Sequence, residues 1–298
     1  LKPVAPQITD ISESLAKAQH LLNTPISVRG YDPIYDEKFE WAIPRDVIGS
    51  WLTISPGDQG PIINVDENQV GAYLATLDEA LGPERWIDPA ESNPIIAQAM
   101  RSETPAVLSI RHKSTSYIVK SGDTLLKIGW NLGFPIWVIL NANPGMDPDN
   151  LLAGQVLTIP SRDELLPLPV VENKRIVLSI SKQRMWVYEN GELLGKHVIS
   201  TGMDRSPTQP GVFQVQTHDP KAYASVWDLT MPNFLGIYEA WPGFMNGIHG
   251  LPTLSNGRRL WANILGRPAS YGCIILDLKT AKWLYNWAED GVVVEIEP

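Results

Sequence analysis

The feature that most constrains the fold is a succession of short β-strand patterns that begins at Lys174. Apolar, β-branched and aromatic residues fill 176–180 and 184–188, and the following turn contains Asn190-Gly191, a dipeptide typical of two-residue hairpins. Another strand pattern at residues 197–200 ends at Thr201-Gly202. Several short strands at this spacing are typical of a sandwich or a barrel. We therefore expect a mostly-β domain, sandwich or barrel-like, over residues 174–298.

Residues 116–161 predict a separate small module. After a strand pattern, Gly122 supplies a turn, and Asp123 or Thr124 is placed to cap a helix by accepting a backbone N–H. A second helix ends near Asn143, and residues 154–160 read as a turn and a closing strand. This order predicts a βααβ unit. The Pro-rich, charged stretch 162–173 that follows is typical of a linker.

Residues 1–115 mix helix and strand patterns and predict an α+β domain. Thr9 or Ser12 can cap a first helix, and Asp66 can cap a later one. The other expected elements are strands at 26–29, 39–43, 62–65 and 107–110, a helix at 44–52 with proline in its first turn, and burial of Val70, Leu74, Leu77 and Leu81. His20 and His112 have no clustered partner in the sequence, and we expect both to be surface histidines.

Composition narrows the class of partner. The net charge of −9 argues against a nucleic-acid partner, because phosphate binding needs a basic face. No apolar run approaches the ~20 residues that span a bilayer, and the start of the chain lacks the apolar region of a signal peptide. Leu1-Lys2-Pro3-Val4 reads like a chain already trimmed of an export or anchor segment. No His-x-x-x-His or Cys-x-x-Cys pair occurs, so we predict neither a metal nor another cofactor.

Cys273 is the only cysteine, so it cannot form an internal disulfide. A free thiol with a pKa of ~8.5 is mostly protonated at neutral pH and needs a base or a cation beside it to act as a nucleophile. His249 is the nearest candidate base in the sequence. Gly272 lets the chain turn tightly, which exposes the sulfur and directs backbone N–H groups toward a developing oxyanion. A lone cysteine is more often a small core residue, so the surrounding sequence decides.

The surrounding sequence contains a series of further recognisable stretches: Ser179 to Tyr188, Ser200-Thr201-Gly202, Thr208 to Phe213, Met231-Pro232, Gly247 to Gly250, Ser270 to Cys273, Leu284 and Gly291 to Val294. In these stretches and in their order, residues 174–297 resemble the L,D-transpeptidase catalytic domain, a family of cysteine enzymes that forms 3→3 cross-links in peptidoglycan. This resemblance supports the interpretation of Cys273 as a nucleophile.

The two preceding regions also resemble wall-associated modules. Residues 116–161 resemble a LysM module, a βααβ unit that binds N-acetylglucosamine-containing glycans, through Gly-Asp-Thr-Leu, Asn-x-Asn and Gly-Gln-x-Leu-x-Ile-Pro markers. Residues 1–115 resemble a peptidoglycan-binding domain found beside wall-modifying catalytic domains. The LysM resemblance implies a glycan groove that includes Gly122, Asp123, Thr124 and Leu125, although these residues also shape turns and caps.

The catalytic resemblance implies a role for each matching residue. Cys273 would be the nucleophile, His249 its general base, and the carbonyl of Gly250 would orient the imidazole. The backbone N–H groups of Gly272 and Cys273 would stabilise the oxyanion, assisted by the hydroxyl of Tyr238. The residues implied to contact the substrate are Ser270, Tyr271, Tyr238 and Met231. His197 and His218 are expected to be structural or surface groups.

Two positions depart from the family pattern. The usual Ser-His-Gly-Cys has Tyr271 in place of histidine, and Ile275 stands where arginine or asparagine is usual. Tyrosine can donate a hydrogen bond but cannot carry a positive charge at neutral pH. The longer-than-usual loop before Ser270 either supplies positive charge to an anionic stem peptide or is an ordinary basic loop; its candidates are Arg258, Arg259, Trp261 and Arg267.

These resemblances predict an extracytoplasmic cell-wall L,D-transpeptidase that acts on peptidoglycan stem peptides through a cysteine thioester. Modules that bind glycan strands would raise the effective concentration of the catalytic site at its polymer. Two alternatives remain open at this point. One is an L,D-carboxypeptidase, in which water resolves the thioester. The other is a non-catalytic peptidoglycan-binding protein with a degenerate site, which Tyr271 and Ile275 favour and the Cys273–His249 pair opposes.

Overall fold

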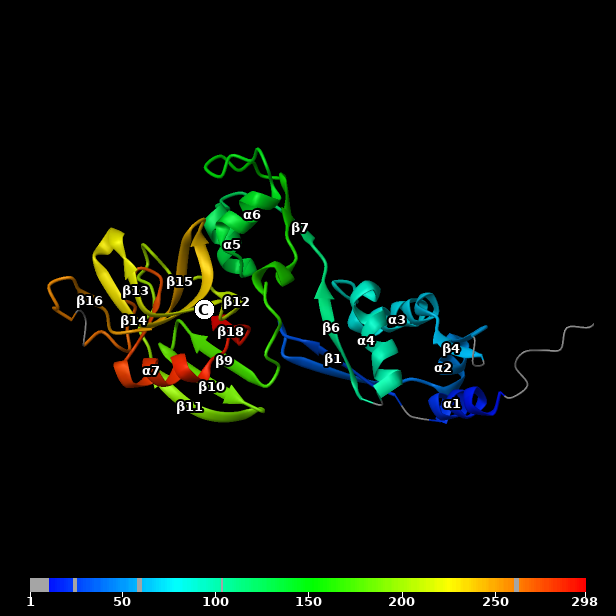
Figure 1. Cartoon of the computed structure of the whole chain (residues 1–298). Coiled ribbons are helices and arrows are strands. Elements are labelled where there is room, and N and C mark those ends of the chain that lie inside the picture. Colours follow the sequence, from blue (N-terminus) through cyan, green and yellow to red (C-terminus); the bar gives the residue numbers. More distant parts are fainter. Residues whose placement is uncertain (1–10, 24–25, 58–60, 103, 260–262) are drawn as a thin grey trace, which may run out of the picture. The chain divides into compact units, whose positions relative to one another are not determined.

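The computed structural model describes residues 11–23, 26–57, 61–102, 104–259 and 263–298 (Figure 1). The chain divides into two compact units, Leu1–Lys113 and Ser114–Pro298. The first helix, α1 (Ser12–Asn23), begins at Ser12, whereas the alternative cap Thr9 lies outside the described residues.

The first unit is built on a four-stranded sheet with the order β2–β1–β6–β5. In this sheet β1 and β6 run parallel, while the other two pairs are antiparallel, and β3 and β4 form a separate hairpin. The elements after α1 are β1 (Ser27–Asp32), β2 (Glu37–Ala42), α2 (Arg45–Trp51), β3 (Leu52–Ser55), β4 (Ile62–Val65), α3 (Glu67–Leu81), β5 (Arg85–Ile87), α4 (Pro89–Ser102) and β6 (Ala106–His112).

The core of this unit lies between the helices and the sheet. Asp66 caps α3 by accepting the Asn68 N–H at 3.0 Å, and α3 then buries Val70, Leu74 and Leu81, while Leu77 is partly buried. Trp51, at the end of α2, is almost fully buried in the same cluster. The sequence patterns did not predict α4 or β5.

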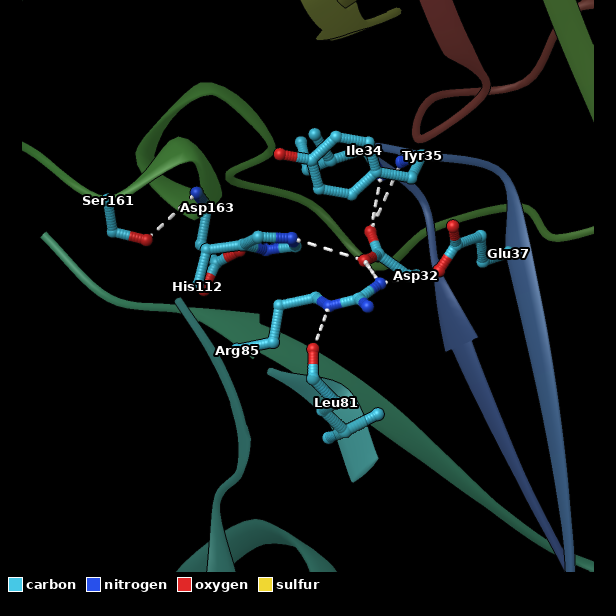
Figure 2. Close-up of polar contacts among 9 residues, drawn as sticks. All are labelled: Asp32, Ile34, Tyr35, Glu37, Leu81, Arg85, His112, Ser161 and Asp163. Atoms are coloured by element: carbon cyan, nitrogen blue, oxygen red, sulfur yellow. Dashed lines mark hydrogen bonds and ion pairs between the residues drawn. The ribbon is translucent and has the colours of Figure 1, made fainter. Parts of the chain in front are cut away.

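The expectation that His112 lies on the surface is wrong, whereas His20 is exposed as expected. Asp32 is a fully buried carboxylate at the end of β1, with the Arg85 guanidinium at 3.1 Å and the His112 imidazole at 3.3 Å (Figure 2). It also accepts the backbone N–H groups of Ile34 and Tyr35. Burial opposes ionisation of Asp32, but these partners outweigh it and hold the pKa of the carboxyl below its ordinary value.

The second unit opens with the LysM-like module. Strands β7 (Thr115–Ile118) and β8 (Val156–Ile159) pair antiparallel around α5 (Leu125–Leu132) and α6 (Ile136–Ala142). Thr124, rather than Asp123, caps α5 by accepting the Lys127 N–H at 3.2 Å. The side chain of Asn143 bonds both backbone groups of Thr158, which fixes the end of α6 to β8.

The rest of the unit is mostly β, in two main sheets (Figure 1). The first has the order β11–β10–β9–β18–β12, and the second has β13–β14–β15–β17, with β16 paired to β14. The elements are β9 (Lys174–Ser179), β10 (Arg184–Glu189), β11 (Glu192–Val198), β12 (Gly211–Gln214), β13 (Thr217–Ala224), η2 (Ser225–Trp227), β14 (Leu229–Trp241), β15 (Phe244–Gly250), β16 (Thr253–Leu254), β17 (Ile274–Leu276), α7 (Leu278–Trp287) and β18 (Val293–Glu297).

One hydrophobic core connects the LysM-like module to the β sheets. A single buried cluster includes Ile128 and Phe134 of the module, Met185 and Phe213 of one sheet, and Leu235 of the other. Sheets that share a core in this way pack face to face. The two parts of this unit are therefore one packed body.

The expected linker at residues 162–173 is packed rather than extended. It contains the short 3-10 helix η1 (Arg162–Leu165), and Leu165 joins the shared core. Leu168 exchanges two hydrogen bonds with the side chain of Gln214, and Val171 donates to the carbonyl of Gly291. These contacts fix the LysM-like module against the β sheets.

No single helix in the described part of the chain is long and apolar enough to cross a membrane. Among the same described residues, α5 and α6 taken together reach that length and apolarity, but they are bent by 103° at the break between them.

Candidate active site

Two neighbouring strands bring Cys273 and His249 to the same face of a sheet. Strands β15 and β17 run parallel, with His249 opposite Ile275, and Cys273 directly precedes β17. The ring of Phe234 stacks on the His249 imidazole and belongs to the small cluster against which Cys273 packs, so Phe234 lies beside both side chains.

The His249 imidazole is buried and oriented by the backbone. Its Nδ1 lies 2.7 Å from the carbonyl oxygen of Gly250. A carbonyl only accepts hydrogen bonds, so Nδ1 carries the proton and Nε2 keeps its lone pair. Burial lowers the pKa of His249 to about 4, although the Gly250 carbonyl acts in the opposite direction. The resting imidazole is therefore neutral at pH 7, and the ring of Phe234 stacks on it at 6.1 Å.

Cys273 is half-buried as a residue, and its thiol bonds to an asparagine that the sequence analysis did not single out. Its Sγ donates to Oδ1 of Asn246 at 3.5 Å, and Asn246 is itself buried. Burial raises the pKa of Cys273 to about 11, while the Gly247 N–H acts to lower it. Within the described residues, His249 and Cys273 make no hydrogen bond to each other, so the resting pair is a neutral thiol and a neutral imidazole.

Asn246 was overlooked because an asparagine in a strand has no spacing signature of its own. The signal available in the sequence was a single polar residue in an otherwise glycine-rich and apolar stretch, three positions before His249.

The turn before Cys273 is held from several sides. Gly272 has φ +112°, and a Cβ added there would lie 2.7 Å from the Asn246 side-chain nitrogen, so the position requires glycine. The Gly272 carbonyl accepts the hydroxyl of Thr208 at 2.7 Å. The hydroxyl of Ser270 donates to the Cys273 carbonyl at 2.5 Å and accepts the Gly272 N–H at 3.1 Å. Ser270, expected at the substrate, thus shapes the turn.

Tyr238 lies beside this turn at the end of a short hydrogen-bond chain. Its hydroxyl oxygen accepts the Gln209 N–H and the Asn246 side-chain N–H, each at 2.9 Å. Burial raises the pKa of this phenol, so it stays protonated. Met231 is buried in the small cluster against which Cys273 packs, so it too lies near the thiol.

Tyr271, the residue in the histidine position, belongs to a cation–aromatic stack. Its ring is parallel to that of Trp227 with centroids 5.0 Å apart, and the guanidinium of Arg205 lies 5.8 Å from its ring centroid. Arg205 thus places a positive charge beside this position, and the sequence analysis did not identify it.

The second departure, Ile275, is explained by packing. It is almost fully buried among Leu251, Ile264 and their neighbours, and its backbone pairs with Ser200. The side chains of Arg258, Arg259 and Arg267 are exposed, and Trp261 lies outside the described residues.

The expected glycan-binding residues adopt the local roles that their types predict. Gly122 has φ +81° in the turn, and Asp123 accepts the Lys120 N–H and the Tyr117 hydroxyl. Thr124 caps α5, and Leu125 is buried in the core. Three of the four therefore shape a loop that is exposed or half-buried.

The other two expected histidines lie on strands. His197 is half-buried on β11, near Thr280 and the ring of Trp283. His218, on β13, bonds Asp290 at 2.8 Å. Both fit the expectation of structural or surface groups, since neither is among the residues that contact Cys273.

Comparison with known proteins gives two domain assignments. Residues 173–296 match the model of the L,D-transpeptidase catalytic domain, and residues 117–160 match the LysM domain. The "Putative L,D-transpeptidase YkuD" of Bacillus licheniformis is 25% identical over 186 residues, which cover 61% of this chain and 98% of that protein. The protein of the same name from Bacillus subtilis is 25% identical over 185 residues, with the same coverage of 61% and 98%.

One solved structure to which this chain is similar is that of an Enterococcus faecium L,D-transpeptidase with a cysteine changed to serine. It is 18% identical to this chain, with a TM-score of 0.45 and coverage of 96% of this chain and 100% of that one. The assignment rests on the two domain matches: this chain carries a LysM domain followed by a domain of the L,D-transpeptidase catalytic family.

Proposed function

We propose that this protein is an extracytoplasmic L,D-transpeptidase that cross-links peptidoglycan through a thioester on Cys273. The observation that carries the proposal is the His249–Gly250 hydrogen bond on the strand beside Cys273, because it leaves Nε2 free to accept the thiol proton. A base oriented by a third group is the arrangement of a nucleophilic triad.

In the acylation step, Cys273 Sγ attacks the carbonyl between the third residue of a tetrapeptide stem and its terminal D-Ala. The thiol proton passes to Nε2 of His249. The imidazolium then gives this proton to the leaving nitrogen, the C–N bond breaks, D-Ala departs, and a thioester remains on Cys273.

In the second step, the side-chain amine of another stem attacks the thioester carbonyl. A new C–N bond forms and the C–S bond breaks. The proton lost by the amine passes through His249 to the departing sulfur, which restores the neutral thiol and imidazole.

The neutral resting pair fits this scheme. A thiol with a pKa near 11 is protonated at neutral pH, and an imidazole with a pKa near 4 is unprotonated. Proton transfer therefore accompanies the attack on the carbonyl rather than preceding it. In the free protein the Cys273 thiol donates its hydrogen bond to Oδ1 of Asn246, so the S–H must rotate toward His249 when the substrate arrives.

Tyr238 is the side-chain donor best placed for the oxyanion. Two N–H groups occupy its acceptor positions, so its own O–H proton is directed elsewhere. The Gly272 N–H is engaged by Ser270 and becomes an oxyanion donor only after that bond opens. A phenol that remains protonated can donate to the oxyanion throughout the reaction.

The LysM domain supplies the proposed tether to glycan strands. Its turn residues Gly122 to Thr124 are held by backbone caps and by the Tyr117–Asp123 bond, so the loop that faces a glycan is preorganised. Binding the polymer beside the catalytic domain raises the local concentration of stem peptides.

The test is whole-protein mass spectrometry after incubation with a carbapenem, for the wild type, Cys273→Ala and His249→Gln. We expect one adduct on the wild type, none on Cys273→Ala, and much slower formation on His249→Gln. Turnover of tetrapeptide stems with and without an acceptor then separates transfer from hydrolysis by water. If the folded wild type takes no adduct and Cys273 is inert to iodoacetamide, the non-catalytic wall-binding alternative replaces this proposal.

A further inference from the structure

Residues 203–208 run beside the turn 270–272, which leads directly to Cys273. Three hydrogen bonds join the two segments, at 3.0, 3.0 and 2.7 Å: from the Met203 N–H to the Ser270 carbonyl, from the Ser206 hydroxyl to the Tyr271 carbonyl, and from the Thr208 hydroxyl to the Gly272 carbonyl. Arg205 stands between the first two of these contacts. The backbone of Arg205 is therefore fixed beside the turn of the nucleophile.

The Arg205 guanidinium is held over the ring of Tyr271, two positions before Cys273. Its central carbon lies 5.8 Å from the ring centroid, and the Tyr271 ring is in turn parallel to that of Trp227 at 5.0 Å. Trp227 packs against the same small buried cluster as Cys273. A guanidinium is charged at any physiological pH. Arg205 therefore places a permanent positive charge on the aromatic pair that flanks the nucleophile.

This charge is not neutralised by an acidic group. Within the described part of the chain, no carboxylate lies within ion-pair distance of the Arg205 guanidinium, whose Nε donates to the Met203 sulfur at 3.1 Å. The carboxylate of Asp228 instead accepts the hydroxyls of Tyr223 and Ser255, at 3.0 and 2.8 Å. Contact with a ring face uses no N–H donor, so both terminal nitrogens of Arg205 keep theirs for a ligand.

We propose that Arg205 recognises anions at this site: its guanidinium attracts and orients a carboxylate of the donor peptide as the peptide approaches Cys273. A planar fork of N–H groups matches the two oxygens of a carboxylate. Tyr271, which cannot carry a positive charge itself, supplies the ring against which the guanidinium is held. Arg205 acts on binding and approach, and it takes no part in proton or acyl transfer.

The identity of the ligand rests on the proposed function. A stem peptide that ends in D-Ala carries a terminal carboxylate one residue beyond the bond that breaks. The charge that Arg205 places near the thiol does not rest on it, because that charge follows from the contacts around Tyr271 alone. The two statements can therefore be tested by separate measurements.

The first experiment measures the effect of the charge at the thiol without any substrate. Cys273, the only cysteine, is alkylated either with iodoacetamide, which is neutral, or with iodoacetate, which carries a carboxylate. Whole-protein mass spectrometry gives the two rates. Both reagents react with the thiolate, so the ratio of the rates cancels any change in the pKa of Cys273. The ratio reports how the surroundings of the thiol treat a carboxylate.

The variants are Arg205→Gln, which removes the charge, and Arg205→Lys, which keeps it. Lys196→Gln is the matched control, because Lys196 is also an exposed cation over an aromatic ring, 5.5 Å from that of Trp186. It lies on β11, the edge strand of one sheet, whereas Cys273 precedes β17 of the other.

We expect Arg205→Gln to lower the ratio of the iodoacetate rate to the iodoacetamide rate by about threefold at low salt, in the range of exposed charge pairs. Arg205→Lys and Lys196→Gln should keep most of the ratio. Added salt should remove the difference between the wild type and Arg205→Gln, because it screens exposed charges.

The second experiment identifies the carboxylate. Donor tetrapeptides with a free C-terminus and with a C-terminal amide are compared in the wild type and Arg205→Gln. Recognition of the terminal carboxylate should appear as a donor KM raised about threefold for the free acid alone, with the maximal rate little changed. An equal rise for both donors assigns the contact to a carboxylate inside the stem.

The two proposals fail separately. An alkylation ratio or donor KM values that Arg205→Gln leaves unchanged overturn the role of Arg205, while turnover by the wild type keeps the enzyme assignment. If the folded wild type takes neither a carbapenem nor a donor, the proposed function fails, and the alkylation ratio still decides whether Arg205 acts on anions at the thiol.

Discussion

At the scale of single residues, the chemistry depends on which hydrogen bond each polar atom makes. The Gly250 carbonyl sets the tautomer of His249, and the Asn246 side chain accepts the hydrogen bond of the Cys273 thiol. Neither contact requires charge, and burial suppresses charge on both His249 and Cys273. The resting site is therefore a neutral pair, which substrate binding must activate in the proposed reaction.

The first prediction concerns the pH dependence of Cys273. Because its pKa is raised to about 11, the thiolate fraction should grow about tenfold per pH unit between about pH 7 and pH 9. Iodoacetamide alkylation, followed by mass spectrometry, should rise accordingly without a plateau. A plateau with a midpoint near neutral pH would instead show a thiolate–imidazolium pair.

The pH dependence of the rate of carbapenem acylation should reflect the ionisation of His249 rather than that of the Cys273 thiol. Its lowered pKa keeps the base form present above about pH 4, so the rate should stay level through mildly acidic pH and fall as the pH drops through about 4. His249→Gln should abolish this profile. A loss of rate already near pH 6.5 would contradict the buried, neutral imidazole.

Gly272→Ala tests the turn before the nucleophile. The φ of +112° and the clash with Asn246 should together cost about 1–3 kcal/mol and displace the Asn246–Cys273 contact. Thermal melting and the alkylation rate measure the two effects. Gly191→Ala is the control, because it has φ +79° but open space around its Cβ, so it should strain the backbone and leave the alkylation rate unchanged.

At the scale of elements, a buried ion cluster joins the ends of three strands of the first unit. Asp32 on β1 pairs with Arg85 on β5 and His112 on β6. A cluster of this kind contributes mainly through the cost of breaking it, because one partner left alone is a buried, uncompensated charge.

Asp32→Asn should therefore destabilise the first unit by about 3 kcal/mol. Hydrogen exchange of the β1 and β6 amides measures this unit by itself. The pKa of Asp32 is lowered in the folded state, so its contribution is present above the ordinary pKa of 3.8 and is lost as the pH falls below that value. Glu40→Gln should change little, because the Arg29–Glu40 pair is exposed and 3.9 Å long.

At the scale of the molecule, the LysM domain and the catalytic domain share one core. Phe134 of the LysM domain and Phe213 of the catalytic domain belong to the same buried cluster. The two domains are thus expected to move as one body.

Phe134→Ala should test this shared core. Removing a buried phenylalanine costs about 3–5 kcal/mol, and the loss should appear in the exchange of both α5 and β9 amides. Leu126→Ala is the control in the same region, because Leu126 is 54% exposed and should have little effect. Exchange that increases in α5 alone would show that the two domains open independently.

Local sequence patterns predicted part of this architecture. The hairpin at Asn190-Gly191 and the caps at Asp66 and Thr124 depend on a few adjacent residues, and they lie where the patterns predicted. Helix α4 was missed because Pro94 lies inside it and proline is a helix breaker in most contexts.

The sequence by itself determined the mostly-β domain from Lys174 onward, the LysM domain before it, and a single cysteine with His249 as its candidate base. Only the tertiary structure decided that His112 is buried beside Asp32, that Asn246 holds the thiol and that Arg205 lies against Tyr271. The reason is physical. Caps, turns and strand periodicity act within a few residues, whereas these contacts join positions far apart in the chain, and their burial and charge exist only once the strands have packed.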